Sequence, residues 1–283
     1  MEIKLKCYAK INLTLDIGAK RQDGYHDITT IMQSISLCDK VTISTNNSGK
    51  ITLSCNVDGV PCDERNIAYK CAAAFYNAYN TECGGVHIDI DKKIPMQAGL
   101  AGGSADGAGV LKGLNLLYGE PFSQIELEEI GASVGSDIPF CIRGGTAKGE
   151  GRGTVLTSLD NMPDCFIVLV KPPIGISTGL AYQQADNRSV IPPSATAQME
   201  KSLDNIKLIG RNLRNDFEDA LANEELLSLK DRLLSFDGTL GAVMTGSGSV
   251  VYALFDDRTK AELCAKEMRC SYDNVFIAQP ITC

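Results

Sequence analysis

Glycines crowd into one short stretch of the sequence, PMQAGLAGGSADGAGVLKGLN, which runs from residue 95 to residue 115. Glycine inside a helix or strand costs roughly 0.5–1 kcal/mol relative to alanine, so this cluster needs a reason. The preceding segment, VHIDIDKKIP, reads as a strand that ends at a proline, and a helix is predicted from Ala105 onward. The glycines are therefore expected between a strand and a helix N-terminus.

A glycine loop in that position can hold an anion. Unpaired backbone N–H groups and the positive end of the helix dipole meet at a helix N-terminus. Without Cβ atoms, the loop can also wrap closely around phosphate oxygens. Lys92 and Lys93 precede the loop and could add positive charge. The alternative is a packed or flexible loop without a ligand, and the glycines alone do not decide between the two.

The loop matches none of three familiar nucleotide-binding patterns. The sequence has no Gly-Lys-Ser/Thr, which a Walker A loop requires, and it has neither the His-Arg-Asp nor the Asp-Phe-Gly of protein kinases. The loop also does not follow the first strand with G-x-G-x-x-G spacing, as a dinucleotide-binding loop does.

Composition and charge narrow the class of protein. The 283 residues, 44% of them hydrophobic, are enough to bury a core without disulfides. A formal net charge of −8 argues against the basic surface of a general nucleic-acid binder. The apolar run CFIVLV is far shorter than the ~20 residues of a membrane helix, and the N-terminus lacks the apolar core of a signal peptide. We expect a cytoplasmic protein that binds neither nucleic acid nor membrane.

The cysteines are expected to be free. The chain has 11 of them, with irregular spacing and no C-x-x-C pair. An odd number in such a pattern argues against a disulfide framework and against a structural zinc site. Small buried hydrophobic side chains in a reducing compartment are the expected role.

Hydrophobic periodicity predicts an α+β chain in two lobes, residues 1–155 and 156–283. Strands are predicted over residues 3–17, 41–53 with a break at NNSGK, 86–90, 165–170, 241–255 with a glycine turn, and 275–278. Helices are predicted over residues 66–79, 105–117, 125–134, 179–185, 215–222, 224–234 and 259–268. The glycine-rich stretch over residues 144–153 marks a change of register, and residues 189–197 are expected to be a loop.

Three motifs resemble the GHMP kinase superfamily, which includes galactokinase and the homoserine, mevalonate and phosphomevalonate kinases. They are AKINLTLDI at residues 9–17, the Pro-x-x-x-Gly-Leu-x-x-Gly-Ser core at 95–104, and GAVMTGSGSVVYALF at 241–255. They occur in the superfamily's order over nearly the whole chain. The resemblance implies an ATP-dependent kinase with a ribosomal-protein-S5-like N-terminal lobe, a ferredoxin-like C-terminal lobe and an active site in the cleft between them.

Narrower features resemble one branch of that superfamily. DGYH at residues 23–26, the loop KKIPMQAGLAGGSADGA and SDIPF at 136–140 are the discriminating stretches. This branch phosphorylates the 2-hydroxyl of 4-diphosphocytidyl-2-C-methyl-D-erythritol in the non-mevalonate route to isoprenoid precursors. The resemblance therefore implies this small-molecule acceptor, ATP as donor with Mg²⁺, and a monomer or weak homodimer.

The same resemblance places Lys10 and Asp137 at catalytic positions, although an Asp after Gly-Ser is by itself more often a cap or turn residue. Asp137 would orient or deprotonate the acceptor hydroxyl. Lys10 would keep Asp137 ionised and stabilise the developing charge. The residues expected to bind ATP are Asn66, Lys92, Pro95, Met96, Gln97, Ala98, Gly99, Leu100, Ala101, Gly102, Gly103, Ser104 and Ala105.

The acceptor is expected to contact five residues at positions that match the branch. Tyr25 and Tyr182 would stack on the two faces of the cytosine, for roughly 1–3 kcal/mol per ring, and His26 would hydrogen-bond its edge. Asn12 and Thr178 would contact the erythritol and diphosphate portion. Without the resemblance, a Tyr-His pair in a glycine turn is an ordinary surface feature.

The chain departs from the superfamily's pattern at two points, and one histidine carries no predicted site role. Several members have two adjacent serines where this chain has Ser104 and Ala105, and the acidic residue that they use for magnesium has no clear counterpart. Asp106 is one candidate, so the metal ligands stay open. His87 is expected to be a buried strand histidine.

Two other functions remain open at the level of the sequence. Another GHMP small-alcohol kinase would be favoured if Tyr25 and Tyr182 did not stack on a base. A non-catalytic nucleotide or sugar sensor has no need for Lys10, Asp137 and an intact glycine loop, so their presence argues against it.

Overall fold

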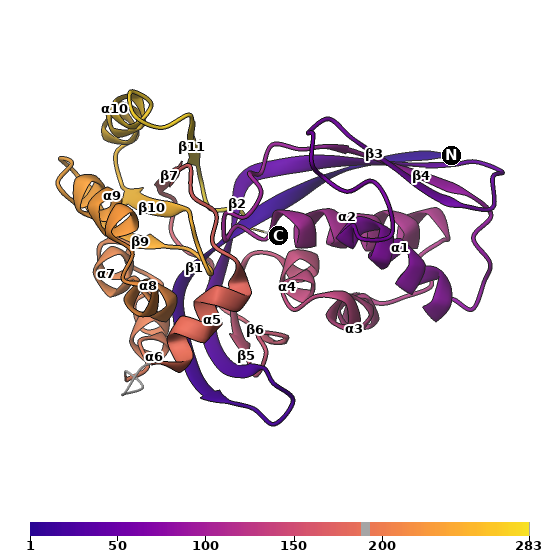
Figure 1. Cartoon of the computed structure of the whole chain (residues 1–283), viewed down its shortest axis with the longest axis horizontal. Coiled ribbons are helices and arrows are strands. Elements are labelled where there is room, and N and C mark those ends of the chain that lie inside the picture. Colours follow the sequence, from indigo (N-terminus) through magenta and orange to yellow (C-terminus); the bar gives the residue numbers. More distant parts are fainter. Residues whose placement is uncertain (188–192, 283) are drawn as a thin grey trace. The chain divides into compact units, whose positions relative to one another are not determined.

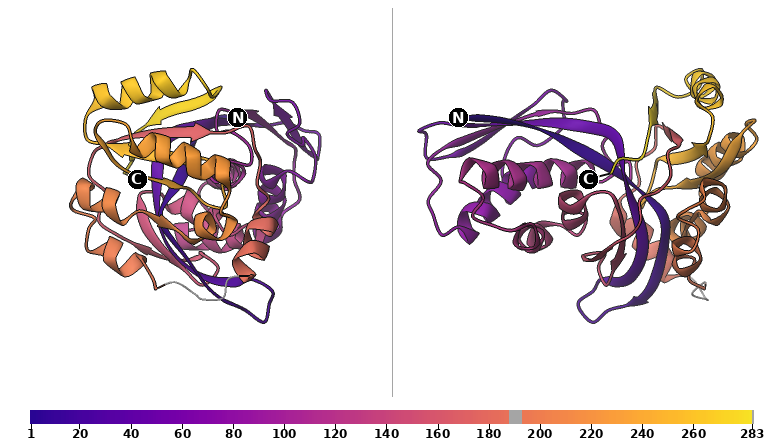
Figure 2. Two further views of the ribbon diagram at one scale, coloured as in Figure 1. Left: turned by 60° about the vertical axis from the view of Figure 1, so that its left-hand side comes forward. Right: turned by 180° about the vertical axis from the view of Figure 1, so that it is seen from behind.

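The computed structural model describes residues 1–187 and 193–282. The chain forms two compact units, and strands β1 (Glu2–Lys20) and β2 (His26–Thr45) run through both (Figures 1 and 2). The mixture of helices and strands confirms the predicted α+β class. A domain boundary at residue 155 stays a prediction. Unit 1 comprises Met1–Ala9, Cys38–Met96 and Ala101–Arg143, and unit 2 comprises Lys10–Leu37, Gln97–Leu100 and Gly144–Cys283.

Unit 1 contains a sheet with the strand order β3-β4-β2-β1. Strands β2 and β4 are antiparallel, with Lys40 opposite Asp91, and β3 and β4 are parallel. The helices of this unit lie on one side of its strands (Figure 1). Its elements beyond β1 and β2 are β3 (Ile51–Cys55), α1 (Ile67–Ala78), β4 (Val86–Asp91), α2 (Gly102–Leu117), α3 (Gln124–Val134) and α4 (Ile138–Arg143).

Glycines let helix α2 pack closely in unit 1. A Cβ atom on Gly107 would lie 2.7 Å from Sγ of Cys71 in α1, and one on Gly109 would lie 2.3 Å from Sγ of Cys7 in β1. Both distances are too short for a real Cβ atom. These two later glycines of the cluster therefore have a packing reason.

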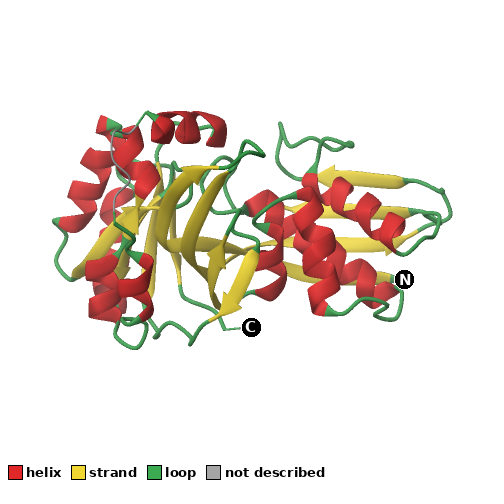
Figure 3. Cartoon of the chain, turned by 90° about the horizontal axis from the view of Figure 1, so that it is seen from below, coloured by secondary structure: helices red, strands yellow, loops and turns green. Residues whose placement is uncertain are grey.

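Unit 2 contains further strands of the first sheet and a second, antiparallel sheet with the order β11-β7-β10-β9 (Figure 3). Strand β8 pairs with β1, β5 pairs with β2, and β6 pairs with β5. The strands are β5 (Thr146–Glu150), β6 (Val155–Ser158), β7 (Phe166–Lys171), β8 (Arg214–Asn215), β9 (Thr239–Met244), β10 (Val251–Phe255) and β11 (Asn274–Ala278). The helices are α5 (Thr178–Asp186), α6 (Thr196–Glu200), α7 (Ile206–Asn212), α8 (Asp216–Leu221), α9 (Glu224–Leu234) and α10 (Arg258–Met268).

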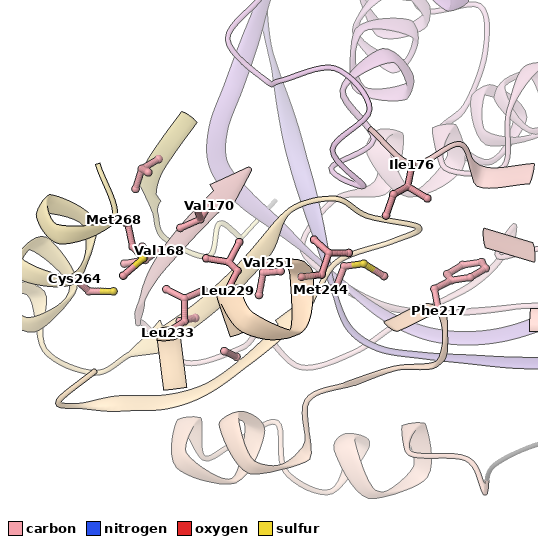
Figure 4. Packing of buried hydrophobic residues seen from close by; sticks show 14 of the residues in the cluster. Val168, Val170, Ile176, Phe217, Leu229, Leu233, Met244, Val251, Cys264 and Met268 are labelled. Atoms are coloured by element: carbon pink, nitrogen blue, oxygen red, sulfur yellow. The ribbon is translucent and has the colours of Figure 1, made fainter. Parts of the chain in front are cut away.

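Helices α9 and α10 cover one face of this second sheet. Leu229 and Leu233 of α9, one helical turn apart, pack with alternate residues of β7 such as Val168 (Figure 4). Met268 of α10 joins the same buried cluster. The cluster gives unit 2 a core of its own.

Most predicted elements agree with the structure to within a few residues, and α9 has the predicted bounds. Strand β2 begins at His26, well before the predicted start, and β5, β6, β8, α4 and α7 were not predicted. Helix α6 begins at Thr196, inside the predicted loop, whose residues 189–192 lie outside the described residues. His87 is only half-buried and hydrogen-bonds the hydroxyls of Thr52 and Ser54, so the prediction of a buried histidine is wrong.

The described cysteines are free, but they are not all buried. Burial raises the pKa of Cys71 and of Cys165 to about 12, so these thiols stay protonated at neutral pH. Cys62 and Cys270 are exposed, which corrects the prediction for those two. Within residues 1–187 and 193–282, no helix is both long and apolar enough to span a bilayer.

Candidate active site

The glycine loop connects β4 to α2 through backbone conformations that favour glycine. The φ angles of Gln97, Gly99 and Ala101 are 51°, 74° and 57°, in the left-handed region that costs other residues energy. A Cβ atom on Gly99 would lie 2.0 Å from the carbonyl oxygen of Thr245. The loop therefore lies directly on the backbone of the third motif, and a side chain at residue 99 does not fit.

Helix α2 begins at Gly102 without a capping side chain. Its N-cap residue, Ala101, has no group that can accept a hydrogen bond from the first turn. The other described helices longer than eight residues, α1, α3, α5, α9 and α10, each begin with a capping Asn, Ser or Asp. The N–H groups of Gly102, Gly103 and Ser104 are therefore available to an anion. The helix begins at Gly102, three residues before the predicted Ala105, and residues 102–104 belong to its first turn.

Lys92, expected to bind ATP, is buried and already paired with two carboxylates. Its ammonium donates to Oδ2 of Asp39 at 2.5 Å and to Oδ2 of Asp106 at 2.7 Å. Burial opposes its charge, but Asp106 and Asp39 together outweigh burial and raise the pKa of Lys92. The charge of Lys92 is thus neutralised within the protein.

Lys10 is also buried, with 3% of its surface exposed, but its partner is neutral. Its Nζ atom donates to Oδ1 of Asn12 at 2.6 Å, and no described carboxylate pairs with it. Its backbone N–H donates to the carbonyl oxygen of Leu100 in the glycine loop at 3.2 Å. A buried ammonium without a carboxylate is costly unless an anion supplies the opposite charge.

Asn12 uses both of its polar side-chain atoms inside the protein. Its Oδ1 accepts from Lys10 and from the N–H of Gly246 at 3.0 Å, and its Nδ2 donates to Oγ1 of Thr30 at 2.8 Å. The hydroxyl of Thr245 accepts from the backbone N–H of Asn12 at 3.0 Å. The structure thus places Asn12 as the residue that orients Lys10, and its predicted contact with substrate stays a prediction.

Asp137 lies directly before α4 and is half-buried. Its carbonyl oxygen accepts from the N–H of Cys141, as the first turn of a helix requires. None of the described residues hydrogen-bonds its carboxylate. The carboxylate is therefore available for an external hydroxyl group.

The residues predicted for the cytosine make two separate ring contacts, one between His26 and Tyr182 and one between Tyr25 and Arg152. The ring of Tyr182 stacks on His26, with centroids 4.8 Å apart and planes 12° from parallel. Nε2 of His26 lies 2.6 Å from Oδ1 of Asp186, and the guanidinium carbon of Arg152 lies 3.7 Å from the ring centroid of Tyr25. Tyr25 is 49% exposed. The structure brings His26 and Tyr182 together, and it adds Asp186 and Arg152 to the group.

Two other predicted contacts have partners within the chain. The hydroxyl of Thr178 lies 3.0 Å from that of Ser247, in the turn of the third motif. Asn66 is the N-cap of α1: its Oδ1 accepts from the N–H of Ala68 at 2.8 Å, and its Nδ2 donates to the carbonyl oxygen of Pro61 at 2.7 Å. Their roles toward substrate and ATP stay predictions.

Several residues of these networks were not found from the sequence. Asp39 and Thr245 act through contacts with residues distant in the chain, and although Thr245 lies in the third motif, the sequence does not reveal these contacts. Asp186 follows Tyr182 by four residues on α5, so helical spacing could have placed both on one face. Arg152 lies in the glycine-rich stretch GEGRG, for which no side-chain role was predicted.

The described residues contain no group of three or more His, Cys, Asp or Glu side chains that could hold a metal ion. Mg²⁺ that arrives with ATP does not need such a group, because it keeps several waters and binds through phosphates and one or two carboxylates. Asp106 already gives one oxygen to Lys92.

Comparison with known proteins identifies the fold over nearly the whole chain. The profile described as GHMP kinases N terminal domain matches residues 66–145, and that described as GHMP kinases C terminal matches residues 199–274. A homoserine kinase from Cytophaga hutchinsonii superposes with a TM-score of 0.79 at 18% identity, covering 98% of this chain and 94% of that one, which shows the shared fold. The predicted GHMP kinase fold is confirmed.

Two relatives that are more than 40% identical to this chain are named as the same kinase. The 4-diphosphocytidyl-2-C-methyl-D-erythritol kinase of Clostridium beijerinckii is 44% identical over 283 residues, covering 99% of this chain and all of the relative. That of Clostridium tetani is 41% identical over the same length and coverage. A crystal structure of 4-(cytidine 5'-diphospho)-2C-methyl-D-erythritol kinase has a TM-score of 0.83 at 27% identity, covering 99% and 100% of the two chains. The chain belongs to the 4-diphosphocytidyl-2-C-methyl-D-erythritol kinase family of GHMP kinases.

Proposed function

We propose that this kinase transfers the γ-phosphoryl group of ATP to the 2-hydroxyl of 4-diphosphocytidyl-2-C-methyl-D-erythritol, giving the 2-phosphate and ADP in the non-mevalonate pathway of isoprenoid biosynthesis. The observation that carries the proposal is the 44% identity, over the whole chain, with a kinase named for this substrate. The uncapped start of α2 and the uncompensated charge of Lys10 support it independently.

The glycine loop and the first turn of α2 hold the phosphates of ATP in this proposal. The N–H groups of Gly102, Gly103 and Ser104 would donate to phosphate oxygens, and the dipole of a helix of this length favours negative charge there. Mg²⁺ would accompany ATP and neutralise charge between its phosphates. The remaining residues from Pro95 to Ala105 form the loop around this anion.

Lys10 and Asp137 act on the transferred group. Phosphoryl transfer depends chiefly on positioning and on stabilisation of charge. Asp137 would accept the hydrogen bond of the acceptor hydroxyl and take its proton as the new O–P bond forms and the bond to ADP breaks. Lys10, held by Asn12, would place its ammonium at the oxygens whose charge grows in the transition state.

The acceptor's cytosine would bind beside Tyr25, His26 and Tyr182. His26 covers one face of Tyr182, so a base cannot lie between these two rings without separating them. Because Asp186 can only accept a hydrogen bond from Nε2 of His26 when ionised, it favours a proton on that nitrogen and leaves Nδ1 toward the base. Thr178 is proposed to contact the diphosphate portion.

Two further parts of the functional proposal concern the state of the enzyme. Free cysteines and dependence on ATP support a cytoplasmic location. A monomer or weak homodimer is the proposed assembly, which sedimentation at two protein concentrations would test.

A substrate panel tests the function. ATP consumption is measured with the diphosphocytidyl substrate, mevalonate and homoserine as separate acceptors. We expect turnover with the first and none above background with the other two. Preference for mevalonate or homoserine would assign the chain to another small-alcohol kinase, and nucleotide binding without turnover on any acceptor would favour a sensor.

A further inference from the structure

The entry to the glycine loop is held by a buried carboxylate. Asp39 on β2 is fully buried, and its Oδ1 accepts hydrogen bonds from the backbone N–H groups of Lys93 at 2.5 Å and Ile94 at 2.7 Å. These residues immediately precede Pro95, where the loop begins. The antiparallel register that sets Lys40 opposite Asp91 brings Asp39 beside this segment. The two bonds fix the direction in which the chain leaves β4.

The exit from the loop is held by the same network. Lys92 donates to the other oxygen of Asp39 and to Asp106 in α2, and its side chain is only 7% exposed. A Cβ atom on Gly102 would lie 2.9 Å from Cγ2 of Ile94 and 3.0 Å from Nζ of Lys92. The first turn of α2 therefore lies directly on the segment that enters the loop. Lys92 therefore links Asp39, which holds the entry to the loop, with Asp106 in the helix that follows the loop.

We propose that Asp39, Lys92 and Asp106 form a buried clamp that fixes the two ends of the glycine loop, and that Lys92 acts on ATP through this clamp and not as a phosphate ligand. The inference rests on the proposed function, because it assigns the loop to ATP. All three are positioning residues: they would hold the N–H groups of Gly102 and Gly103 at the spacing that phosphate oxygens require.

Lys92 and Lys10 differ in the charge of their partners. Two carboxylates surround Lys92, so the cluster has no excess positive charge to offer a phosphate when both are ionised. Lys10 has a neutral amide as its partner, which supplies no opposite charge. An anion would have to displace a carboxylate from Lys92, whereas it would meet Lys10 without such a loss.

Substitution of Asp39 distinguishes a clamp from a direct ligand. In Asp39→Asn, the amide oxygen can still accept hydrogen bonds from the two backbone N–H groups, but the NH₂ group faces the ammonium of Lys92, so the bond to Lys92 is lost. In Asp39→Ala, the bond to Lys92 and the two bonds to the backbone are all lost. For a clamp, the Kd of ATP measured by calorimetry rises in Asp39→Asn and rises further in Asp39→Ala, by at least about tenfold, as expected for the loss of charge-assisted hydrogen bonds. The KM of the acceptor stays unchanged.

The opposite result would identify Lys92 as a direct ligand. Freed from Asp39, a phosphate-binding Lys92 would bind ATP as well as before or more tightly, and an unchanged or lower Kd in Asp39→Asn would overturn the clamp. If Asp39→Ala does not fold, Asp39→Asn decides alone.

A matched control separates a clamp from a general loss of stability. Glu128→Gln removes a partly buried ion pair between Glu128 of α3 and Arg143 of α4, 2.6 Å long and in the same unit. We expect it to lower the unfolding midpoint and leave the Kd of ATP unchanged. A rise in Kd as large as that of the Asp39 variants would show that a general loss of stability, and not the loss of the clamp, weakens ATP binding. Wild-type protein that binds ATP but does not phosphorylate the diphosphocytidyl substrate would contradict the proposed function and leave the clamp standing.

Discussion

The ammonium of Lys10 lies 2.6 Å from the amide oxygen of Asn12, and this neutral amide is its partner in the structure. An amide satisfies one donor of the ammonium without cancelling its charge. The same amide oxygen accepts from the N–H of Gly246, so the third motif fixes the direction of the lysine. Lys10 is therefore oriented and buried, and no described carboxylate neutralises it, which suits a group that stabilises a transferred phosphoryl.

Replacing Lys10 by Met should lower kcat by roughly 100- to 1,000-fold, the usual loss when one group that stabilises transition-state charge is removed. The Kd of ATP should change much less, because the glycine loop supplies most of the phosphate contacts. Steady-state kinetics and calorimetry measure the two quantities. Lys148→Met is the control: Lys148 is a more exposed lysine of the same unit, paired with Glu200, and its loss should leave kcat unchanged. Equal effects of the two substitutions would remove Lys10 from the mechanism.

Replacing Asp137 by Asn should abolish most of the turnover while ATP still binds. The amide cannot take the proton of the acceptor hydroxyl, and the loss of a general base costs roughly 100- to 10,000-fold. Single-turnover kinetics, which isolate the chemical step, measure the effect. Near-normal single-turnover rates in the variant would show that Asp137 does not act on the hydroxyl.

Removing the ring of Tyr182 should weaken binding of the cytidyl substrate. Base–aromatic stacking contributes about 1–3 kcal/mol, so Tyr182→Ala should raise the KM of the acceptor roughly tenfold and leave the KM of ATP nearly unchanged. Tyr182→Phe keeps the ring over His26 and serves as the matched control. Equal KM values for the Ala and Phe variants would contradict stacking by this residue.

Asp106 should make the stability of the protein depend on pH. Burial raises the pKa of Asp106 to about 7, although Lys92 acts in the opposite direction, and the ordinary value is 3.8. Between these two values the folded state retains a proton that the unfolded state has released. The contribution of Asp106 to the free energy of unfolding therefore falls as pH rises through this window.

Asp106→Asn removes this titration, so the variant should gain stability relative to wild type as pH rises from 5 to 8, on the order of 1 kcal/mol or more. Urea denaturation at several pH values measures the difference. Parallel stability curves for the two proteins would show that Asp106 does not titrate in this range.

The sequence predicted those helices and strands whose pattern of residues is visible within the segment itself. Helices α3 and α9 were both recognised from the sequence. The structure shows that α3 has the capping box of Ser123 and Glu126 and that α9 has leucines at helical spacing. The first half of β2 was missed because its pairing with β5, Thr30 opposite Gly149, is a long-range contact. Helix α4 is short and holds Pro139, so no periodicity could reveal it.

The sequence predicts candidate groups for the site but not the contacts that distinguish them. The glycine loop, Lys10 and Asp137 follow from motifs, but no motif separates Lys10 from Lys92. The difference arises from Asp39, which lies 53 residues before Lys92 and meets it only in the folded sheet. Asn12 likewise reads as a polar strand residue, and only its contacts with Thr30 and Gly246 show that it orients a lysine.

The transfer of phosphate from ATP to one hydroxyl group can be followed by ³¹P NMR of the reaction with 4-diphosphocytidyl-2-C-methyl-D-erythritol. We expect one new phosphomonoester resonance, coupled to the carbon that bears the 2-hydroxyl, growing in step with ADP while the diphosphate bridge stays intact. Formation of ADP with free phosphate alone, or of an ester at another hydroxyl, would contradict this transfer.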